Sequence, residues 1–153
     1  MRPSIEEQLQ GTCRVLEKVV APCVTDPYAR TILEGLIANL RMLTGALPAV
    51  PAFLAGDNRS TATLLKQLQA VVAPDLAKRI EEAVAQSDPD ATDMRALGLR
   101  NCELRALFSS AVSGSELPPA MRAAALSHMS ARAAAAPMRY VSTSSPTAKP
   151  TSC

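Results

Sequence analysis

The residue types that carry most enzyme chemistry are sparse in this chain. It has a single histidine, His128, and 4 cysteines among 153 residues. A nucleophilic triad needs a base beside the nucleophile, and no serine or cysteine lies in a recognisable nucleophile motif. His128 and Arg132 lie one turn apart near the end of an alanine-rich segment, where cations suit the negative end of a helix dipole. We therefore interpret His128 as a capping or surface residue and do not expect an enzyme.

Metal and nucleotide motifs are also missing from the sequence. The cysteines have no CxxC spacing, so we expect no metal site; they are Cys13, Cys23, Cys102 and Cys153. Cys13 shares a helical stripe with apolar residues and is expected to be buried, which leaves Cys153 as the accessible thiol. The 6 glycines are dispersed and form no phosphate-binding loop. We expect no cofactor.

Four polar residues are the best candidates for a ligand site. Asn101 projects into the middle of an apolar stripe, and a buried amide without partners costs about 1–3 kcal/mol. Its candidate partners are Asn39, Asp57 and Asn58. If these side chains converge, they form either a register-setting hydrogen-bond network or the polar part of a pocket for a small amphipathic molecule.

Composition and helix-capping signals predict an all-α protein. Hydrophobic residues make up 48% of the chain but aromatic residues only 3%, and the apolar residues are mainly Ala and Leu, which favour helices. Ser4 and Glu7 form a capping box ahead of a helix over 5–20. Asp26 followed by Pro27 predicts the start of a second helix that runs to about Ala46.

The second helix is predicted to be the central helix of a bundle. Projection at about 100° per residue places its large apolar residues on one broad arc, which we expect to be core. The arc contains Ile32, Leu33, Leu36, Ile37, Leu40, Leu43 and Leu47.

The rest of the chain reads as further helices joined by short connections. Prolines break the stretch 47–54, and 56–58 has turn chemistry ahead of a third helix that stops near Pro74. Asp75 is the candidate cap of a fourth helix, and either Thr92 or Asp93 opens a fifth. A sixth helix runs from about Pro119 to Pro137. Such connections predict an up-and-down helical bundle of four to five main helices plus short helices, in a single domain over 1–140. Residues 141–153 are polar and are predicted to be a disordered tail.

The distribution of charge and the absence of targeting signals bear on nucleic-acid binding, membrane insertion and cellular location. Residues 118–153 carry four basic side chains and no acidic one, which is too sparse for nucleic acid, so we do not expect nucleic-acid binding. The sequence contains no stretch of 18 uninterrupted apolar residues, so we expect no membrane span. The first residues do not have the pattern of a leader peptide. We expect a cytoplasmic protein.

Several segments of the first 110 or so residues resemble one protein family. They are the run 1–9, the helix exit 19–22, the segment 26–29, the pair 53–54 with 57–58, and 64–65. They look like a family of uncharacterised small helical bacterial proteins that tend to be encoded near acyl-CoA dehydrogenases and aminoglycoside-phosphotransferase-like proteins. The resemblance implies an accessory role in acyl-CoA or lipid-related catabolism.

Together these patterns favour a non-enzymatic interaction or accessory protein. Its apolar content exceeds what one small core absorbs, so we expect it to bind a second copy of itself or another protein. The alternative is a carrier or sensor of a small amphipathic ligand, with Asn39, Asp57, Asn58 and Asn101 lining its pocket.

Overall fold

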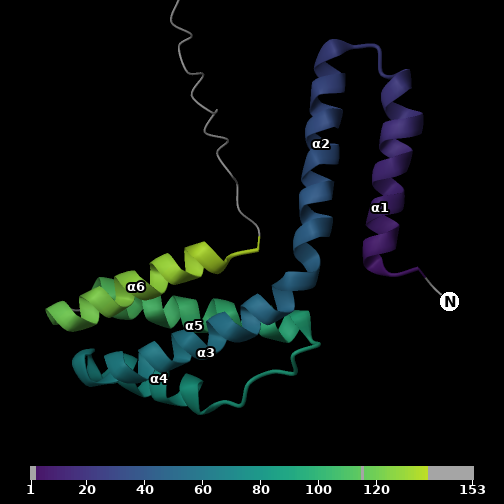
Figure 1. Ribbon diagram of the computed structural model, residues 1–153. Coiled ribbons are helices and arrows are strands. Elements are labelled where there is room, and N and C mark those ends of the chain that lie inside the picture. The colour runs from purple at the N-terminus through teal and green to yellow at the C-terminus, as the bar shows by residue number, and fades with distance from the viewer. Residues whose placement is uncertain (1–2, 115, 138–153) are drawn as a thin grey trace, which may run out of the picture.

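The computed structural model describes residues 3–114 and 116–137, and these form α-helices with no strand among them (Figure 1). The all-α prediction is confirmed. The predicted tail, 141–153, lies outside the described residues. The helices are α1 (Ile5–Val15), α2 (Pro27–Ala46), α3 (Val50–Leu68), α4 (Pro74–Ala85), α5 (Met94–Gly114) and α6 (Pro119–Ala135).

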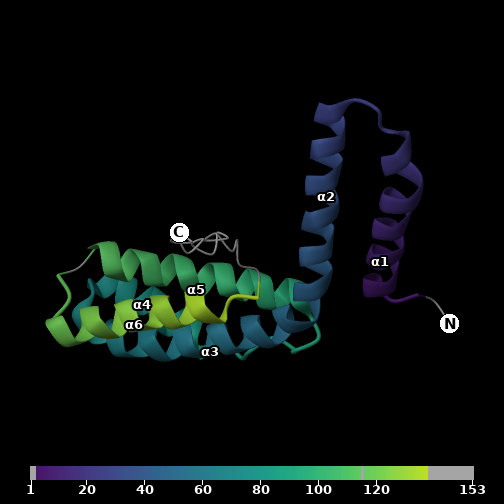
Figure 2. The same cartoon turned by 45° about the horizontal axis from the view of Figure 1, so that its top comes forward.

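Helices α3 to α6 form an up-and-down body with the main core between them (Figure 2). Leucines of α3 and α5 pack against Ile80 of α4, and the small Ala125 lets α6 approach closely. The fully or nearly buried apolar residues of this core are Leu64, Leu65, Leu68, Ile80, Ala83, Leu104, Leu107, Phe108, Ala111, Leu117 and Ala125.

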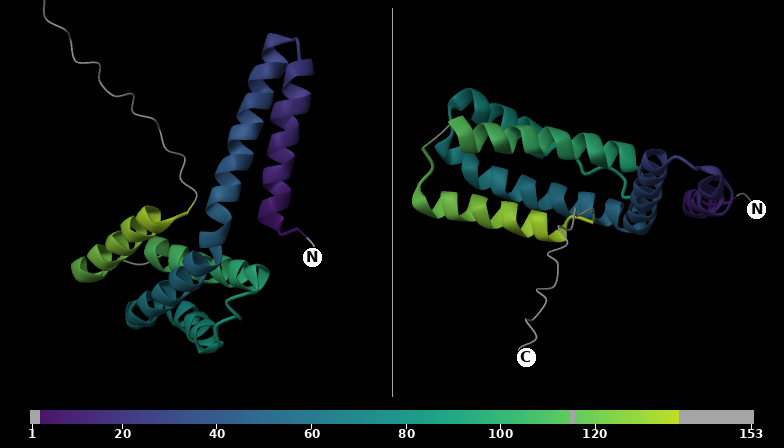
Figure 3. Two further views of the ribbon diagram at one scale, coloured as in Figure 1. Left: turned by 45° about the vertical axis from the view of Figure 1, so that its right-hand side comes forward. Right: turned by 90° about the horizontal axis from the view of Figure 1, so that it is seen from above.

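The central helix of this body is α3, and the prediction that 27–46 would be central is wrong. Helix α3 packs against α4, α5 and α6, and it runs between α5 and α6 in the right panel of Figure 3. The sequence signal was misleading because Pro48 and Pro51 redirect the chain at a 3-10 turn, Leu47–Ala49, between α2 and α3.

Helices α1 and α2 instead form a hairpin that stands away from the body (Figures 1 and 2). The main contacts of α1 are with α2 and with the π-helical turn Leu16–Val20 that follows it. Part of the arc predicted as core is therefore uncovered, because Ile32, Leu36 and Leu43 are 55%, 48% and 38% exposed. That part of the core prediction is wrong for the single chain.

The predicted helix starts are confirmed where a side chain caps the backbone. Ser4 and Glu7 form the capping box of α1. The Asp26 carboxylate accepts a hydrogen bond from the Ala29 N–H, with Pro27 in the first helical position. Asp93 accepts one from the Ala96 N–H at the start of α5. Asp75 lies in the first turn of α4, but Ala73 occupies its cap position.

The predicted turn at 56–58 is wrong, because α3 runs through these residues without interruption. Asp57 and Asn58 are both buried on the inner side of α3. Their partners on α5 and α6, described below, stabilise the helical conformation that the local turn preference opposes.

A buried arginine joins α4 to α5. Arg100 donates a hydrogen bond to the carbonyl oxygen of Ala83 near the end of α4, and another to Glu103, at 2.8 Å. The same carbonyl accepts the Gln86 N–H, so the arginine adds a second hydrogen bond in the last turn of α4.

The cysteines and one apolar stretch complete the comparison with the sequence. Cys13 is buried as expected, but Cys23 and Cys102 are exposed, and Cys153 lies outside the described residues. The helical stretch Pro27–Val71 is long and apolar enough, by length and composition, to cross a membrane. The absence of a membrane span therefore stays a prediction.

Candidate functional site

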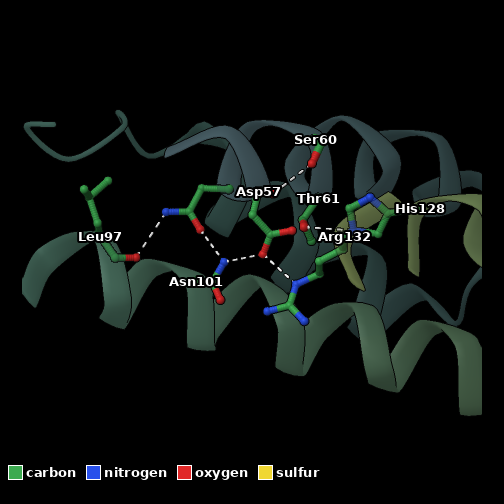
Figure 4. Close-up of polar contacts among 8 residues, drawn as sticks. Asp57, Ser60, Thr61, Leu97, Asn101, His128 and Arg132 are labelled. Carbon is green, nitrogen blue, oxygen red and sulfur yellow. Dashed lines mark hydrogen bonds and ion pairs between the residues drawn. The ribbon is translucent and has the colours of Figure 1, made fainter. Parts of the chain in front are cut away.

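Polar side chains from three helices meet in the interior of the α3–α6 body (Figure 4). We name this group the polar cluster. It comprises Asp57, Asn58, Thr61, Asn101, His128 and Arg132, which come from α3, α5 and α6.

Asn101 of α5 is the centre of the hydrogen bonding. Its Nδ2 atom donates to Asp57 Oδ2 at 2.6 Å and to Asn58 Oδ1 at 2.9 Å. Asn58 in turn donates from its own Nδ2 to the carbonyl oxygen of Leu97, at 3.1 Å. Asp57, Asn58 and Asn101 are 6%, 1% and 5% exposed. The three amide and carboxylate groups therefore satisfy one another where water cannot.

The negative charge of Asp57 is balanced from α6. Arg132 Nε donates to Asp57 Oδ2 at 2.8 Å, so that oxygen accepts two hydrogen bonds. The guanidinium also lies 5.8 Å from the centre of the Phe53 ring, one turn before Asp57. Charge-assisted hydrogen bonds of this kind offset part of the cost of burying a carboxylate.

A second α3–α6 contact lies one turn away. Thr61 Oγ1 and His128 Nε2 are 3.1 Å apart, and the His128 ring meets Phe108 edge to face with 5.4 Å between centroids. Thr61 follows Asp57 by four residues on α3, and its partner His128 precedes Arg132 by four residues on α6. The two contacts therefore fix one register between the antiparallel helices.

Asn39 does not join the cluster. It is exposed on α2, in the hairpin outside the α3–α6 body. The structure thus brings together three of the four predicted residues, and it does so in the arrangement of a structural network. Ligand binding by these residues stays a prediction.

One pair in the polar cluster has the spacing of a nucleophile and its base, Thr61 and His128. Thr61 is 1% exposed, so its side chain is almost fully covered by the surrounding helices. In the described part of the chain, no three His, Cys, Asp or Glu side chains gather closely enough to hold a metal ion.

A hollow lies on each side of α6, with His128 and Arg132 lining both. One, of about 320 Å³, lies between α3 and α6 and includes Phe53 and Asp57. The other, of about 370 Å³, lies between α5 and α6 and includes Arg105, Phe108 and Met129. The cluster is thus buried in the body but borders two open grooves.

His128 and Arg132 were not predicted as members of this site. We interpreted His128 as a capping or surface residue, but it is half-buried and contacts α3. His128 and Arg132 are four residues apart, as are Asp57 and Thr61, and this equal spacing is the signal that the two pairs lie on facing sides of two helices. This signal was missed because residues 56–58 were predicted to form a turn and not part of a helix.

Comparison of the chain with protein-family models, with curated proteins and with solved structures finds no match.

Proposed function

We propose that this chain is a non-enzymatic interaction protein whose α1–α2 hairpin binds a second copy of the chain. The α3–α6 body carries the hairpin and contains its own core. The observation behind the proposal is the uncovered apolar face of the hairpin, which we name the hairpin face. Its members are Ile32, Leu36 and Leu43 of α2, with Asn39 among them.

The apolar arc of α2 is wider than α1 can cover. Ile37 is buried, and Leu33 and Leu40 are half-buried, on the side where α1 packs. At about 100° per residue, Ile32 and Leu36 lie on the next sector of the helix, and they are exposed. Large apolar side chains gathered on one exposed face are typical of an interaction surface.

The other side of the hairpin is polar. A groove of about 420 Å³ between α1 and α2 is lined by Glu6, Gln10, Arg14, Glu17 and Arg41 among others, and Arg41 pairs with Glu17 across it. The hairpin is therefore amphipathic as a unit. Its polar side is suited to water, and its apolar side is suited to another apolar surface.

A second copy is the occupant that fits this face best. Two amphipathic helical hairpins packed face to face form a four-helix bundle. A two-fold axis brings the same residues of both copies together, so an uncharged apolar face is complementary to itself. Asn39 lies on the same side of α2 as Ile32, Leu36 and Leu43, and a single amide in an apolar helix seam selects register.

A membrane fits the same face less well. The stretch that includes α2 is apolar enough to span a bilayer by composition. That stretch, however, also carries Arg41, which pairs with Glu17, and crossing a bilayer would place this charge in the hydrocarbon. Membrane binding is therefore treated as an alternative result of the experiment described below.

The accessory role in acyl-CoA or lipid-related catabolism that the family resemblance implies is part of this proposal. In such a role, self-association would present two α3–α6 bodies to a shared partner. A cytoplasmic location is proposed with it.

Sedimentation velocity of the wild-type chain and of Leu36→Glu tests the proposal. We expect a concentration-dependent dimer for the wild type and a monomer for the variant, because the new carboxylate would be buried in the interface. Leu99→Glu is the matched control, since Leu99 of α5 is 64% exposed outside the hairpin, and it should dimerise like the wild type.

Two outcomes contradict the proposal. One is a wild-type monomer at every concentration, and the other is equal behaviour of Leu36→Glu and Leu99→Glu. Co-sedimentation of the wild type with vesicles of neutral and anionic lipid, lost in Leu36→Glu, would assign the hairpin face to a membrane instead.

A further inference from the structure

The groove between α5 and α6 has the size and composition of a small-molecule site. Its volume of about 370 Å³ falls in the range of roughly 300–1,000 Å³ typical of ligand pockets. Thr61 of α3 lies among its lining residues, because α6 rests on α3 and leaves a space toward α5. The groove is separate from the hairpin face.

The ionisable side chains that line this groove are all basic. Arg105 of α5, and His128 and Arg132 of α6, line it, and no carboxylate is among its lining residues. Arg105 makes no ion pair within residues 3–114 and 116–137. A groove with this charge favours an anion over a neutral or cationic ligand.

Arg132 is held in place before any ligand binds. Asp57 accepts its Nε–H group at 2.8 Å, and the two terminal nitrogens point away from that carboxylate in Figure 4. Those nitrogens keep the planar pair of donors that carboxylates and phosphates accept. Because the side chain is already ordered, less conformational entropy is lost when a ligand binds.

The groove also has an apolar part. Phe108 and Met129 line it, and Met129 is 52% exposed. A methionine adapts its shape to an apolar ligand, and covering it would remove apolar surface from water. Inorganic phosphate would leave this surface uncovered.

We propose that the α5–α6 groove binds a small amphipathic anion. Its acidic group lies between Arg105 and Arg132, and its apolar body lies against Phe108 and Met129. This site lies beside the predicted group Asp57, Asn58 and Asn101, and it uses the polar cluster to hold Arg132. The proposal does not depend on self-association.

Calorimetric titration of the full chain with four octyl compounds tests the site. Octanoate and octyl phosphate carry the anion, octanol lacks it, and octylammonium carries the opposite charge. We expect one or both anions to bind about tenfold or more tightly than octanol, and octylammonium to bind no better than octanol. The tighter of the two anions identifies a carboxylate or a phosphate as the preferred acidic group.

Variants locate the binding. Arg105→Gln should weaken anion binding about tenfold, because it removes a charged donor from the groove. Arg95→Gln is the matched control, since Arg95 is also exposed on α5 but does not line the groove, and it should bind like the wild type. Both substitutions lie at exposed positions, so the fold should be unchanged. Circular dichroism of the two variants checks this.

NMR spectra separate the groove from the hairpin face. Octanoate should shift the Met129 methyl and His128 ring signals, and it should do so equally in the Leu36→Glu variant. The proposal is overturned if octanol binds as tightly as both anions, if Arg105→Gln and Arg95→Gln bind alike, or if the shifts occur at Leu36 rather than at Met129. A wild-type monomer with octanoate bound in the groove would contradict only the proposed function.

Discussion

Asp57 and Arg132 are 75 residues apart in the sequence, yet Arg132 Nε donates to Asp57 Oδ2 at 2.8 Å. This contact joins the middle of α3 to the C-terminal part of α6. With the Thr61–His128 contact one turn away, it sets the register of a helix that otherwise presents mostly alanine to the body. Alanine forms helix well but offers little shape to select one packing over another.

A double-mutant cycle measures how strongly Asp57 and Arg132 interact. The Asp57 side chain is 3% exposed and that of Arg132 27%, so we expect a coupling of about 1–3 kcal/mol between Asp57→Ala and Arg132→Ala in urea unfolding. The exposed pair Arg30–Glu34 is the matched control, with side chains 58% and 65% exposed. Its coupling should be about 0–0.5 kcal/mol. Equal coupling in the two pairs would refute the structural role of Asp57 and Arg132.

Truncation of Asn101 should destabilise the body more than its size suggests. Asn101→Ala leaves Asn58 Oδ1 without a donor and removes one of two donors from Asp57. We expect a loss of about 1–3 kcal/mol in the free energy of unfolding. Ser110→Ala, at an exposed position of the same helix, should change it by less than about 0.5 kcal/mol. A loss no larger than that of Ser110→Ala would mean that the network contributes nothing.

The pH dependence of α1 should follow Glu7. The Ser4 backbone N–H, and then the Ser4 hydroxyl, hold the pKa of the Glu7 carboxyl below its ordinary value. A carboxylate whose pKa is lower in the folded state stabilises that state above the ordinary pKa, and the effect is lost as the pH falls through the folded pKa. The start of α1 should therefore fray as the pH falls below the ordinary pKa range of a glutamate carboxyl.

Carboxyl carbon NMR titration of Glu7 checks this prediction. Ser4→Ala removes the hydroxyl but keeps the backbone N–H, so it should raise the pKa of Glu7 only part of the way toward its ordinary value. An unchanged pKa in the Ser4→Ala variant would rule out the hydroxyl as a contributor and leave the backbone N–H as the cause.

Asn39 should limit the affinity of self-association while fixing its register. Asn39→Leu replaces a polar group of the hairpin face by an apolar one, so we expect tighter association together with a mixture of larger oligomers. Sedimentation velocity reports both changes. Unchanged association, with the same oligomer as the wild type, would place Asn39 outside the contact between copies.

The sequence predicts those features of the fold that local chemistry decides. The starts of α1, α2 and α5 follow from Ser4, Asp26 and Asp93, because a side-chain cap acts within a few residues. The turn expected at 56–58 shows the opposite case. There the local preference of Gly56, Asp57 and Asn58 yields to partners that lie on distant helices, and no short window of sequence contains them.

The candidate site was predictable in part for the same reason. Asn101 stood out because an amide in an apolar stripe needs partners, and Asp57 and Asn58 were found among the few that could serve. Asn39 also lies beside an apolar arc, but it belongs to the sector of α2 that the chain leaves exposed. Periodicity identifies an apolar face, and it does not identify what covers that face.

An isotope-filtered NOE experiment on a mixture of labelled and unlabelled chains asks directly what covers the hairpin face. If a second copy covers it, the methyl groups of Ile32 and Leu36 will show NOEs to the other copy, and those of Leu99 will show none. If Ile32 and Leu36 show only contacts within their own chain at concentrations where the wild type sediments as a dimer, or if the chain is monomeric throughout, the hairpin face does not bind a second copy and the proposed function is wrong.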